Sequence, residues 1–197
     1  MARLPRKFYA RPTVLVAREL LGQRLVHRCN GQRLAGLITE TEAYVGEEDL
    51  ACHARVGRTK RTEVMYGLPG HAYVYFNYGI HWMFNVVTQR EGFPAAVLIR
   101  GIQPIEGIEA MRRHRHNRAE PLLANGPGKL AQALAIDGAF HGADLCARDA
   151  ELFIEQTSAI PDSQIICGPR VGIENVPEPW RSIQWSFKWK RSVISDQ

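Results

Sequence analysis

The turn-forming pair Asn30-Gly31 separates two runs of strand-type residues, and it limits the possible folds of this chain more than any other feature. The runs are QRLVHRC at 23–29 and QRLAGLITETEAYV at 32–45. An Asn-Gly pair between two such runs is typical of a type I′ turn, because both of its residues adopt a positive φ there. The sequence therefore predicts an antiparallel β-hairpin near the start of the chain.

Strand-type segments outnumber helical ones in the rest of the 197 residues. We expect further strands at 71–78, 81–88, 95–103, 152–155, 164–167 and 183–189. Helices are expected between Pro12 and Gly22, at 105–116 and at 128–136. Because strands and helices seldom alternate as βαβ units, the pattern predicts an α+β fold. We expect residues 1–197 to form a single compact domain, with a mixed, mostly antiparallel curved β-sheet and surrounding helices.

Composition excludes several classes of protein. Hydrophobic residues make up 45% of the chain and charged residues 23%, which is typical of globular proteins and excludes a disordered or fibrous chain. The apolar stretch at 14–21 carries Arg18 and Glu19, so it is neither a signal-peptide core nor a membrane span. Four cysteines without a C-x-x-C pair indicate a reducing compartment, and no zinc site or disulfide framework: Cys29, Cys52, Cys146 and Cys167.

The net charge of +5 favours an anionic partner. Of the 25 lysines and arginines, 12 lie in three segments that contain no acid, at 55–61, 112–118 and 181–191. Cations gathered in a groove would release counterions from a phosphate backbone, as in nucleic-acid-binding proteins. The same segments would suit solvated loops that never meet in space, so charge alone leaves both interpretations open.

The second run of the predicted hairpin changes from apolar to acidic along its length. Since side chains of a strand alternate between faces, one face should carry Leu34, Gly36, Ile38, Glu40, Glu42 and Tyr44. A partly buried carboxylate at the end of such a strand could act as a general base with a raised pKa. The alternative is a solvated strand end at which Glu40 and Glu42 pair with arginines, and these residues alone favour that alternative.

Three further acids at 47–49 precede His53. Together with Glu40 and Glu42 they could form a carboxylate cage for Mg²⁺, as in a two-metal nuclease. They could instead begin a helix, because acids in the first turn suit the helix dipole, and we favour the helix start. His53 lies between these acids and the basic segment 55–61, so it remains a candidate functional residue.

The stretch HAYVYFNYGIHWMFN at 71–85 is the richest in aromatic residues. Tyr73 and Tyr75 share a strand face, and Tyr78 would lie at the turn, where a tyrosine can point outward. Aromatic rings interleaved with amides and histidines suit stacking on an unstacked base, with Asn85 reading a base edge. A sheet core is the alternative for the aromatic stripe, but it explains a tyrosine at a turn tip poorly.

The sequence NGPGKL at 125–130 is similar to a phosphate-binding loop only in outline, because Leu130 follows the lysine where Ser or Thr would be needed. A helix start with Lys129 beside it could still contact one backbone phosphate. The alternative is a Gly-Pro turn that simply precedes a helix.

Taken together, these motifs resemble those of the alkyladenine (3-methyladenine) DNA glycosylase family, and the chain is identified as a member of it. The matching blocks are ARELLGQRLV (17–26), GLITETEAYVGEEDLACHA (36–54), RTKR (58–61), PGHAYVYFNYGIHWMFNVV (69–87), AAVLIRGIQPIEG (95–107), NGPGKLAQAL (125–134) and GPRVGI (168–173). They span nearly the whole chain, and their combination is highly specific although each block alone is weak.

The resemblance implies hydrolysis of the N-glycosidic bond of a damaged purine that is first flipped out of duplex DNA. Glu42 matches the family's catalytic acid, which would activate a water for attack on the sugar C1′. Arg100 matches a basic residue that contacts the target phosphate or that water. Tyr78 matches the side chain that intercalates in the duplex and fills the vacated gap.

The resemblance also implies the walls of a base pocket. Tyr44 and Tyr75 match residues that sandwich the flipped base, and His53 matches a third wall. Asn85 matches the residue that crowds the 2-amino group of guanine and so discourages removal of the normal base. The implied substrates are 3-methyladenine, 7-methylguanine, hypoxanthine and ethenoadenine.

Three positions depart from the family's pattern. Ile80 stands where many relatives have Met, Met83 where many have Cys, and Thr62 where Asn is frequent. These departures bear on the range of substrates and not on the reaction.

The resemblance implies an enzyme without a cofactor or a metal, which acts as a monomer on double-stranded DNA containing damaged purines and not at a membrane. We expect it in the cytoplasm at the nucleoid of a bacterium, or in the nucleus of a eukaryote. Three rivals stay open: a metal-dependent nuclease using the acids of 40–49, a binding module without activity, and a bifunctional glycosylase with Lys129 as Schiff-base nucleophile. The last is disfavoured, because no apolar run or cationic cluster beside Lys129 would clearly lower its pKa.

Overall fold

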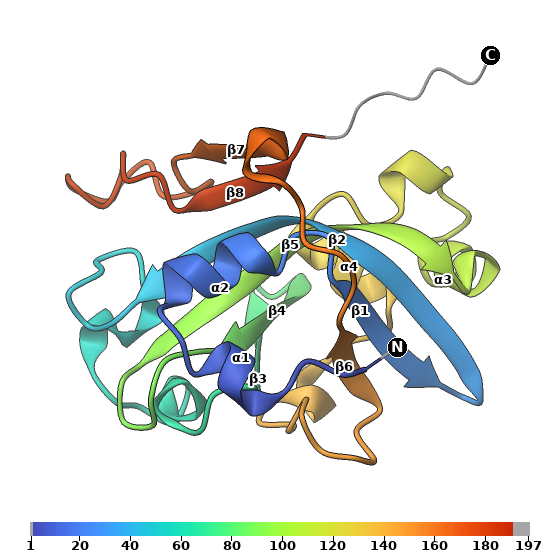
Figure 1. Cartoon of the computed structure of the whole chain (residues 1–197), viewed down its shortest axis with the longest axis horizontal. Coiled ribbons are helices and arrows are strands. Elements are labelled where there is room, and N and C mark those ends of the chain that lie inside the picture. Colours follow the sequence, from blue (N-terminus) through green and yellow to red (C-terminus); the bar gives the residue numbers. More distant parts are fainter. Residues whose placement is uncertain (1, 191–197) are drawn as a thin grey trace.

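The fold is built on one curved, unclosed sheet, seen in the computed structural model, which describes residues 2–190 (Figure 1). Its strands are β1 (Arg24–Cys29), β2 (Gln32–Val45), β3 (Ala72–Asn77), β4 (His81–Val87), β5 (Ala95–Glu106), β6 (Leu152–Glu155), β7 (Ile165–Gly168) and β8 (Ser186–Trp189). The order is β3-β4-β5-β2-β1-β6, and β8 joins β7 to an edge of β2. The neighbouring strands pair antiparallel, so the predicted hairpin at Asn30-Gly31 and the α+β class are confirmed.

Short helices accompany the sheet. They are α1 (Arg6–Tyr9), α2 (Thr13–Glu19), α3 (Ile108–His114) and α4 (Pro127–Ala133), with the 3₁₀ turns η1 (His53–Val56), η2 (Glu63–Tyr66), η3 (Glu120–Leu122), η4 (Gly138–Phe140) and η5 (Asp162–Gln164). The helix predicted at 105–116 begins later than expected, because residues 105 and 106 still belong to β5. Gly107 separates the two elements with a φ of 71°, and a Cβ there would lie 2.8 Å from the carbonyl oxygen of Arg33.

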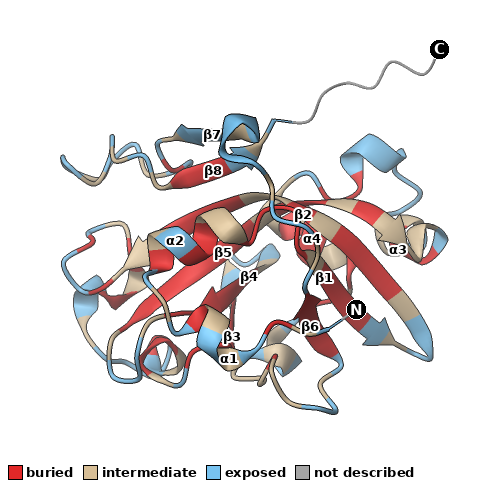
Figure 2. Cartoon of the chain, in the orientation of Figure 1, coloured by how far each residue is buried: buried red, intermediate tan, exposed pale blue. Residues whose placement is uncertain are grey.

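The main hydrophobic core lies on one face of the sheet. α2 contributes Val16 and Ala17 to it, α4 contributes Leu130 and Ala133, and Ile99 comes from β5. Figure 1 shows β2 and β5 arching across the molecule with α2 in front of them, and Figure 2 shows that many residues of both strands are buried. The opposite face of β3, β4 and β5 is therefore free of this core.

An irregularity in the middle of β2 changes which side chains face the core. The register between β2 and β5 shifts at Glu40, between the pairs formed by Ile38 and Thr41. Ile38 and Ala43 consequently belong to the same core although they are five residues apart, and the Thr41 hydroxyl donates a hydrogen bond to the Ala17 carbonyl of α2 (2.7 Å). An extra residue in one strand changes which of the following side chains face each side of the sheet.

The expectation that six residues of β2 share one face is therefore wrong. Leu34 and Ile38 face the main core, whereas Glu42 and Tyr44 lie on the other face beyond the irregularity at Glu40. The assumption that side chains alternate strictly between the two faces of a strand cannot reveal such an irregularity, because the side chains before it and after it each alternate normally.

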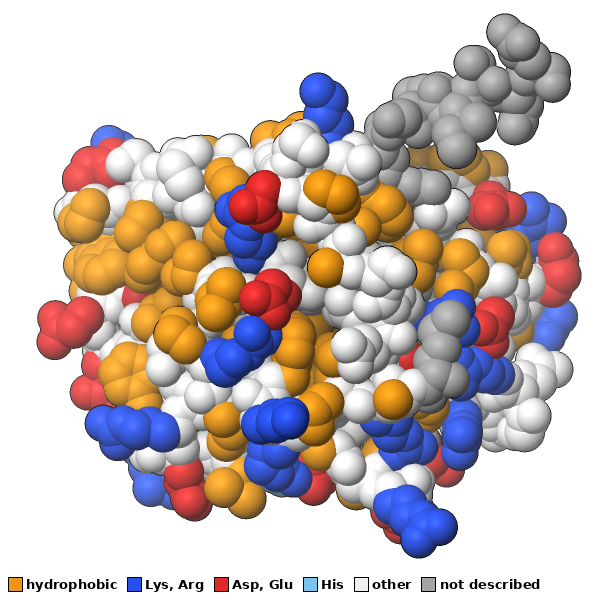
Figure 3. Space-filling model, viewed as in Figure 1, with side chains coloured by type: hydrophobic (Ala, Val, Ile, Leu, Met, Phe, Trp, Pro, Cys, Tyr) orange, Lys and Arg blue, Asp and Glu red, His pale blue; other side chains and the backbone are white. Residues whose placement is uncertain are grey.

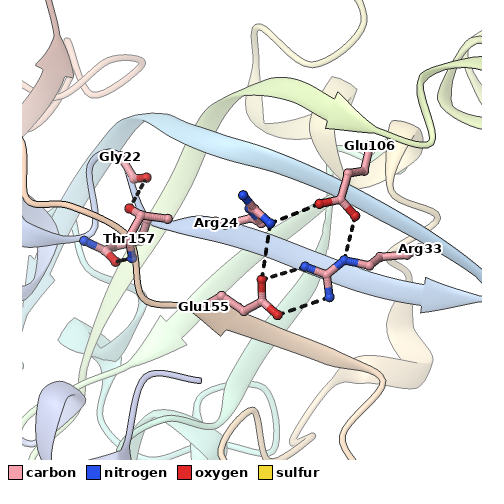
Figure 4. A network of polar contacts seen from close by, with 7 residues as sticks. Gly22, Arg24, Arg33, Glu106, Glu155 and Thr157 are labelled. Atoms are coloured by element: carbon pink, nitrogen blue, oxygen red, sulfur yellow. Dashed lines mark hydrogen bonds and ion pairs between the residues drawn. The ribbon is translucent and has the colours of Figure 1, made fainter. Parts of the chain in front are cut away.

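Ion pairs tie together the strands at the other end of β2 (Figure 4). Arg33 contacts Glu106 of β5 and Glu155 of β6, each at 2.6 Å, and Arg24 of β1 contacts Glu106 at 3.0 Å. The four residues come from four neighbouring strands, so the network links β5, β2, β1 and β6 far along β2 from Glu42.

On the face that carries α2, the lysines and arginines lie among acids and apolar side chains, and several of them stand closer together toward the lower right of the view (Figure 3). Of the three basic segments, 112–118 includes the end of α3, where Arg112 pairs with Glu109 and Glu120. Residue 191, the last cation of the third segment, lies outside the described residues. Among the helices of residues 2–190, none has the length and apolar character needed to cross a membrane.

Candidate functional site

A row of side chains crosses four strands on the face opposite the main core. Glu42 of β2 pairs with Leu98 of β5, Leu98 pairs with Asn85 of β4, and Asn85 pairs with Tyr73 of β3. Since cross-strand partners share a face, antiparallel pairing alone brings these residues side by side although they are distant in sequence.

A cavity of about 270 Å³ opens on this face. Six of the eight residues that the sequence indicates for a site line it: Tyr44, His53, Tyr75, Tyr78, Asn85 and Arg100. Glu42 lies directly behind the wall, because it contacts both Tyr44 and Arg100. Lys129 does not line the cavity, although Pro127 of the same helix does.

The Glu42 side chain is fully buried and held from three sides. Its Oε1 accepts a hydrogen bond from the Val171 N–H (2.8 Å), and its Oε2 accepts one from the Tyr44 hydroxyl (2.8 Å). The Arg100 Nε lies 3.3 Å from Oε1. Burial raises the pKa of Glu42 above its ordinary value, and the Arg100 charge with the Val171 and Tyr44 hydrogen bonds opposes that shift. Glu42 is thus no solvated strand end, although it does pair with an arginine.

Arg100 is shared between two carboxylates. Its Nε lies 3.2 Å from Glu40 Oε1, close to its distance from Glu42. Lys188 of β8 also contacts Glu40, at 3.0 Å. Glu40 therefore neutralises part of the positive charge beside Glu42.

His53 is a neutral wall of the cavity. Its Nδ1 lies 2.9 Å from the Tyr73 hydroxyl oxygen, and its ring meets the edge of Tyr75 at 4.6 Å between centroids. Burial, with the nearby charges of Arg61 and Arg55, lowers the pKa of His53 to about 4. The imidazole is consequently uncharged at neutral pH, so it can face either a neutral or a cationic aromatic ring.

Acidification should destabilise the fold partly through His53. In the unfolded chain the pKa of a histidine is about 6.5, whereas in the folded protein burial lowers the pKa of His53 to about 4. Between these values the unfolded state binds the proton first, so stability falls as the pH falls through that window. We expect the loss of Tm between about pH 6.5 and pH 4 to be smaller in His53→Gln than in the wild type. Equal losses would contradict a neutral buried His53.

Asn85 is buried at the back of the cavity. Its side-chain Nδ2 donates a hydrogen bond to the Tyr73 carbonyl at 2.9 Å, which fixes the amide in place. Met83, the next residue of β4 on this face, also lines the cavity. Thr62 does not; its hydroxyl donates to the Gly57 carbonyl at 3.0 Å and closes a turn.

Tyr78 lies at the tip of the β3–β4 hairpin, as predicted. Its side chain is 89% exposed, and Ile80 beside it is 67% exposed. Tyr78 and Gly79 have φ angles of 50° and 67°, so the turn needs left-handed backbone at both positions. No packing in the described chain requires a large aromatic residue here, which leaves the ring free for an external partner.

Lys129 occupies the first turn of α4, where its Nζ donates a hydrogen bond to Asn125 Oδ1 at 2.9 Å. A Gly-Pro turn therefore precedes a helix here, as both interpretations of this segment require. The basic segment 55–61 is different, because its Arg61 reaches the cavity wall: the guanidinium lies 5.1 Å from the Tyr75 ring centroid. The sequence patterns indicated Arg61 only as part of the basic segment 55–61 and of the RTKR block, and not as a residue of the cavity.

The acids at 47–49 do not begin a helix, so that prediction is wrong. They lie in a turn, and the first helical residue after them is His53 in η1. The Asp49 carboxylate accepts hydrogen bonds from the Val45 and Ala51 N–H groups and binds Arg170, so its oxygens close the turn instead of capping a helix. Within residues 2–190, no three His, Cys, Asp or Glu side chains lie close enough to hold a metal ion.

Comparisons with known proteins agree on one family. The family profile described as methylpurine-DNA glycosylase (MPG) matches residues 7–192. Relatives named as 3-methyladenine DNA glycosylases include one from Methanocella arvoryzae, 50% identical with 90% of each chain covered, and one from Desulfitobacterium hafniense, 48% identical with 92% of this chain and 94% of the relative covered. A third, from Legionella pneumophila, is 42% identical over 100% of this chain and 96% of its own. The chain therefore belongs to the methylpurine-DNA glycosylase family and is a DNA-repair enzyme, a hydrolase of N-glycosyl bonds.

Proposed function

We propose that the protein flips a damaged purine out of duplex DNA into this cavity and hydrolyses its N-glycosidic bond with a water activated by Glu42. The observation that supports this most strongly is one fully buried carboxylate with a raised pKa directly behind the wall of an aromatic cavity. A raised pKa makes a carboxylate a better general base, because proton transfer is most efficient when the pKa lies near the working pH.

One carboxylate is enough for this reaction if the base leaves easily. The transition state resembles an oxocarbenium ion, which a nearby carboxylate stabilises. A purine alkylated at N3 or N7 already carries a positive charge and departs as a neutral base. Neutral lesions such as hypoxanthine need protonation or a hydrogen bond at N7. We therefore propose both cationic and neutral damaged purines as substrates.

The aromatic walls would bind the flipped base by stacking. Tyr44, Tyr75 and His53 all line the cavity, and a cationic base among such rings gains about 0.5–2 kcal/mol for each cation–π contact. The fixed amide of Asn85 would crowd the 2-amino group of guanine. Damaged bases also flip at lower cost than paired normal bases, which adds selectivity before any contact with the cavity.

The same proposal assigns roles in binding the DNA duplex to Tyr78, Arg100 and Lys129. The exposed Tyr78 ring would enter the base stack and fill the gap that the flipped base leaves. Arg100 lies on the cavity wall, where it would contact the target phosphate or the attacking water, and Lys129 would contact a backbone phosphate nearby. The Lys129 ammonium is bonded to Asn125 and lies off the cavity wall, which favours a monofunctional enzyme over one that forms a Schiff base.

The direct test uses two DNA substrates in EDTA: a duplex with one hypoxanthine and a randomly alkylated DNA. Released base, with strand breaks that appear only after alkali, is the expected result for a metal-independent monofunctional glycosylase. Breaks without alkali would indicate the bifunctional alternative, and breaks that need Mg²⁺ would indicate a nuclease. No released base from either substrate would overturn the proposal and leave a binding module.

A further inference from the structure

A completely buried ion pair lies behind the cavity. Asp49 and Arg170 are both 0% exposed at their side chains, and the guanidinium binds the carboxylate with both terminal nitrogens, at 2.5 and 2.8 Å. The same carboxylate accepts the Val45 N–H at 3.1 Å and the Ala51 N–H at 3.0 Å. Asp49 is therefore anchored to the end of β2 and to the following turn, and it presents a fixed partner to Arg170.

The guanidinium of Arg170 is also held by two rings and two carbonyl groups. It lies 4.7 Å from the centroid of Tyr44 and 5.2 Å from that of Trp185. It donates hydrogen bonds to the carbonyl of Ala43 at 3.0 Å and to that of Trp180 at 3.3 Å. These contacts fasten the segment after β7 to β2 and to the segment that leads into β8.

Val171, the residue that follows Arg170, contacts Glu42 in the candidate active site. The Val171 N–H donates to Glu42 Oε1 at 2.8 Å, while the Val171 side chain is 49% exposed. A half-exposed side chain gives this peptide little packing of its own, so its position depends on the buried anchor of Arg170. A buried ion pair typically adds little net stability compared with an apolar pair of the same size, so its position beside Glu42 is better explained by orientation.

We propose that Arg170, fixed by Asp49, is a positioning residue for the proposed glycosylase reaction. It holds the Val171 N–H on the Glu42 carboxylate and supports the Tyr44 ring from behind. This inference rests on the proposed role of Glu42 as the base.

The predicted effect is a change in the protonation of Glu42. The hydrogen bond from Val171 favours the charged form of the carboxylate, so losing it raises the pKa further. The charged and titratable groups around Glu42 are Glu40 and Tyr44 on β2, Arg100 on β5, Tyr75 on β3, Lys188 of β8 through Glu40, and the Asp49–Arg170 pair. Only the Asp49–Arg170 pair fixes the backbone donor, so only its loss should shift the pKa by releasing Val171.

The experiment measures single-turnover base release from lesion duplex across pH. Two variants are compared with the wild type: Arg170→Lys, which keeps the charge but not the double hydrogen bond, and the double variant D49N/R170M. The double variant leaves no unpaired buried charge, and its asparagine can still accept a backbone hydrogen bond, so the fold is preserved if a single change proves too disruptive. In both variants the acidic limb of the rate profile should move up by about 1–2 pH units, the shift expected when a charged group loses a hydrogen bond.

Glu155→Gln is the matched control. Glu155 is also a buried carboxylate bound by arginines, but it belongs to the network of Figure 4 and has no contact with Glu42. This variant should lose thermal stability and keep the acidic limb at its wild-type position. If the acidic limb of the pH–rate profile shifted equally in Glu155→Gln, general destabilisation would explain the shift, and not the positioning of Val171.

The possible results separate this inference from the proposed function. Wild-type protein that releases no base overturns the proposed function itself. Wild-type protein that releases base, with an unshifted limb in both Arg170→Lys and D49N/R170M, overturns only the positioning role. Reduced rates at every pH with no shift would also overturn it, because that result is what simple loss of folded protein produces.

Discussion

Glu42→Gln is expected to abolish base release while leaving the binding of lesion duplex unchanged. The amide has almost the shape of the carboxylate but cannot accept a proton from water at neutral pH or balance positive charge at the sugar. Positioned general bases typically contribute about 10²–10⁴-fold to a rate, so the single-turnover rate should fall by at least that range. Base release and gel-shift affinity, measured on the same duplex, give the two readouts.

Glu40→Gln is the control for that variant. Glu40 contacts the same Arg100, but the Tyr44 hydroxyl and the Val171 N–H donate to Glu42 instead, so the loss of Glu40 should lower the rate much less. It removes a negative charge that raises the pKa of Glu42, and the acidic limb should therefore move slightly to lower pH. Normal turnover by Glu42→Gln would remove the role that we propose for this carboxylate.

Tyr78→Ala is expected to weaken binding to lesion duplex more than to single-stranded DNA carrying the same lesion. Stacking of an aromatic ring on a base contributes about 1–3 kcal/mol, which corresponds to about 5- to 150-fold in affinity. A single strand has no stacked gap for the ring to fill, so it should lose less. Fluorescence anisotropy with the two forms of one oligonucleotide measures the difference.

Tyr78→Phe separates stacking from hydrogen bonding, because it keeps the ring and removes only the hydroxyl. Its affinity for duplex should stay close to that of the wild type. Because the Tyr78 side chain is 89% exposed, neither substitution should change the Tm appreciably. An equal loss for duplex and single strand in Tyr78→Ala would show that the ring acts as a general DNA contact and not inside the base stack.

Local patterns were enough to predict the strands, because each is bounded by turn residues. The Asn30-Gly31 pair predicts the β1–β2 hairpin, and the break at Tyr78-Gly79 predicts the β3–β4 hairpin with an exposed tyrosine at its tip. Residues at a turn tip have few neighbours in space, so their environment follows from the sequence nearby. Six residues suggested as a site do meet at one cavity. Residue patterns singled out His53, Tyr75, Tyr78 and Asn85, but only the family resemblance grouped them with Tyr44 and Arg100 in one site.

The remaining features depend on contacts between distant segments. Because of the irregularity at Glu40, Glu42 lies on the opposite face of the sheet from Ile38. No residue type in β2 predicts this irregularity. The turn at 47–49 looked like a helix start because the partner of Asp49 is 121 residues away, in Arg170. Local propensity cannot account for a side chain whose binding partner comes from another part of the chain.

The separation of the sheet into a packed face and a cavity face bears on how such enzymes diversify. Met83 and Ile80, which the family resemblance suggests bear on the range of substrates, lie on the cavity wall and at the hairpin tip, away from the core beneath α2 and α4. Distant sites without shared partners change stability independently. Substitutions at these two positions are therefore expected to leave the free energy of unfolding nearly unchanged, so lesion preference can be altered without altering the scaffold.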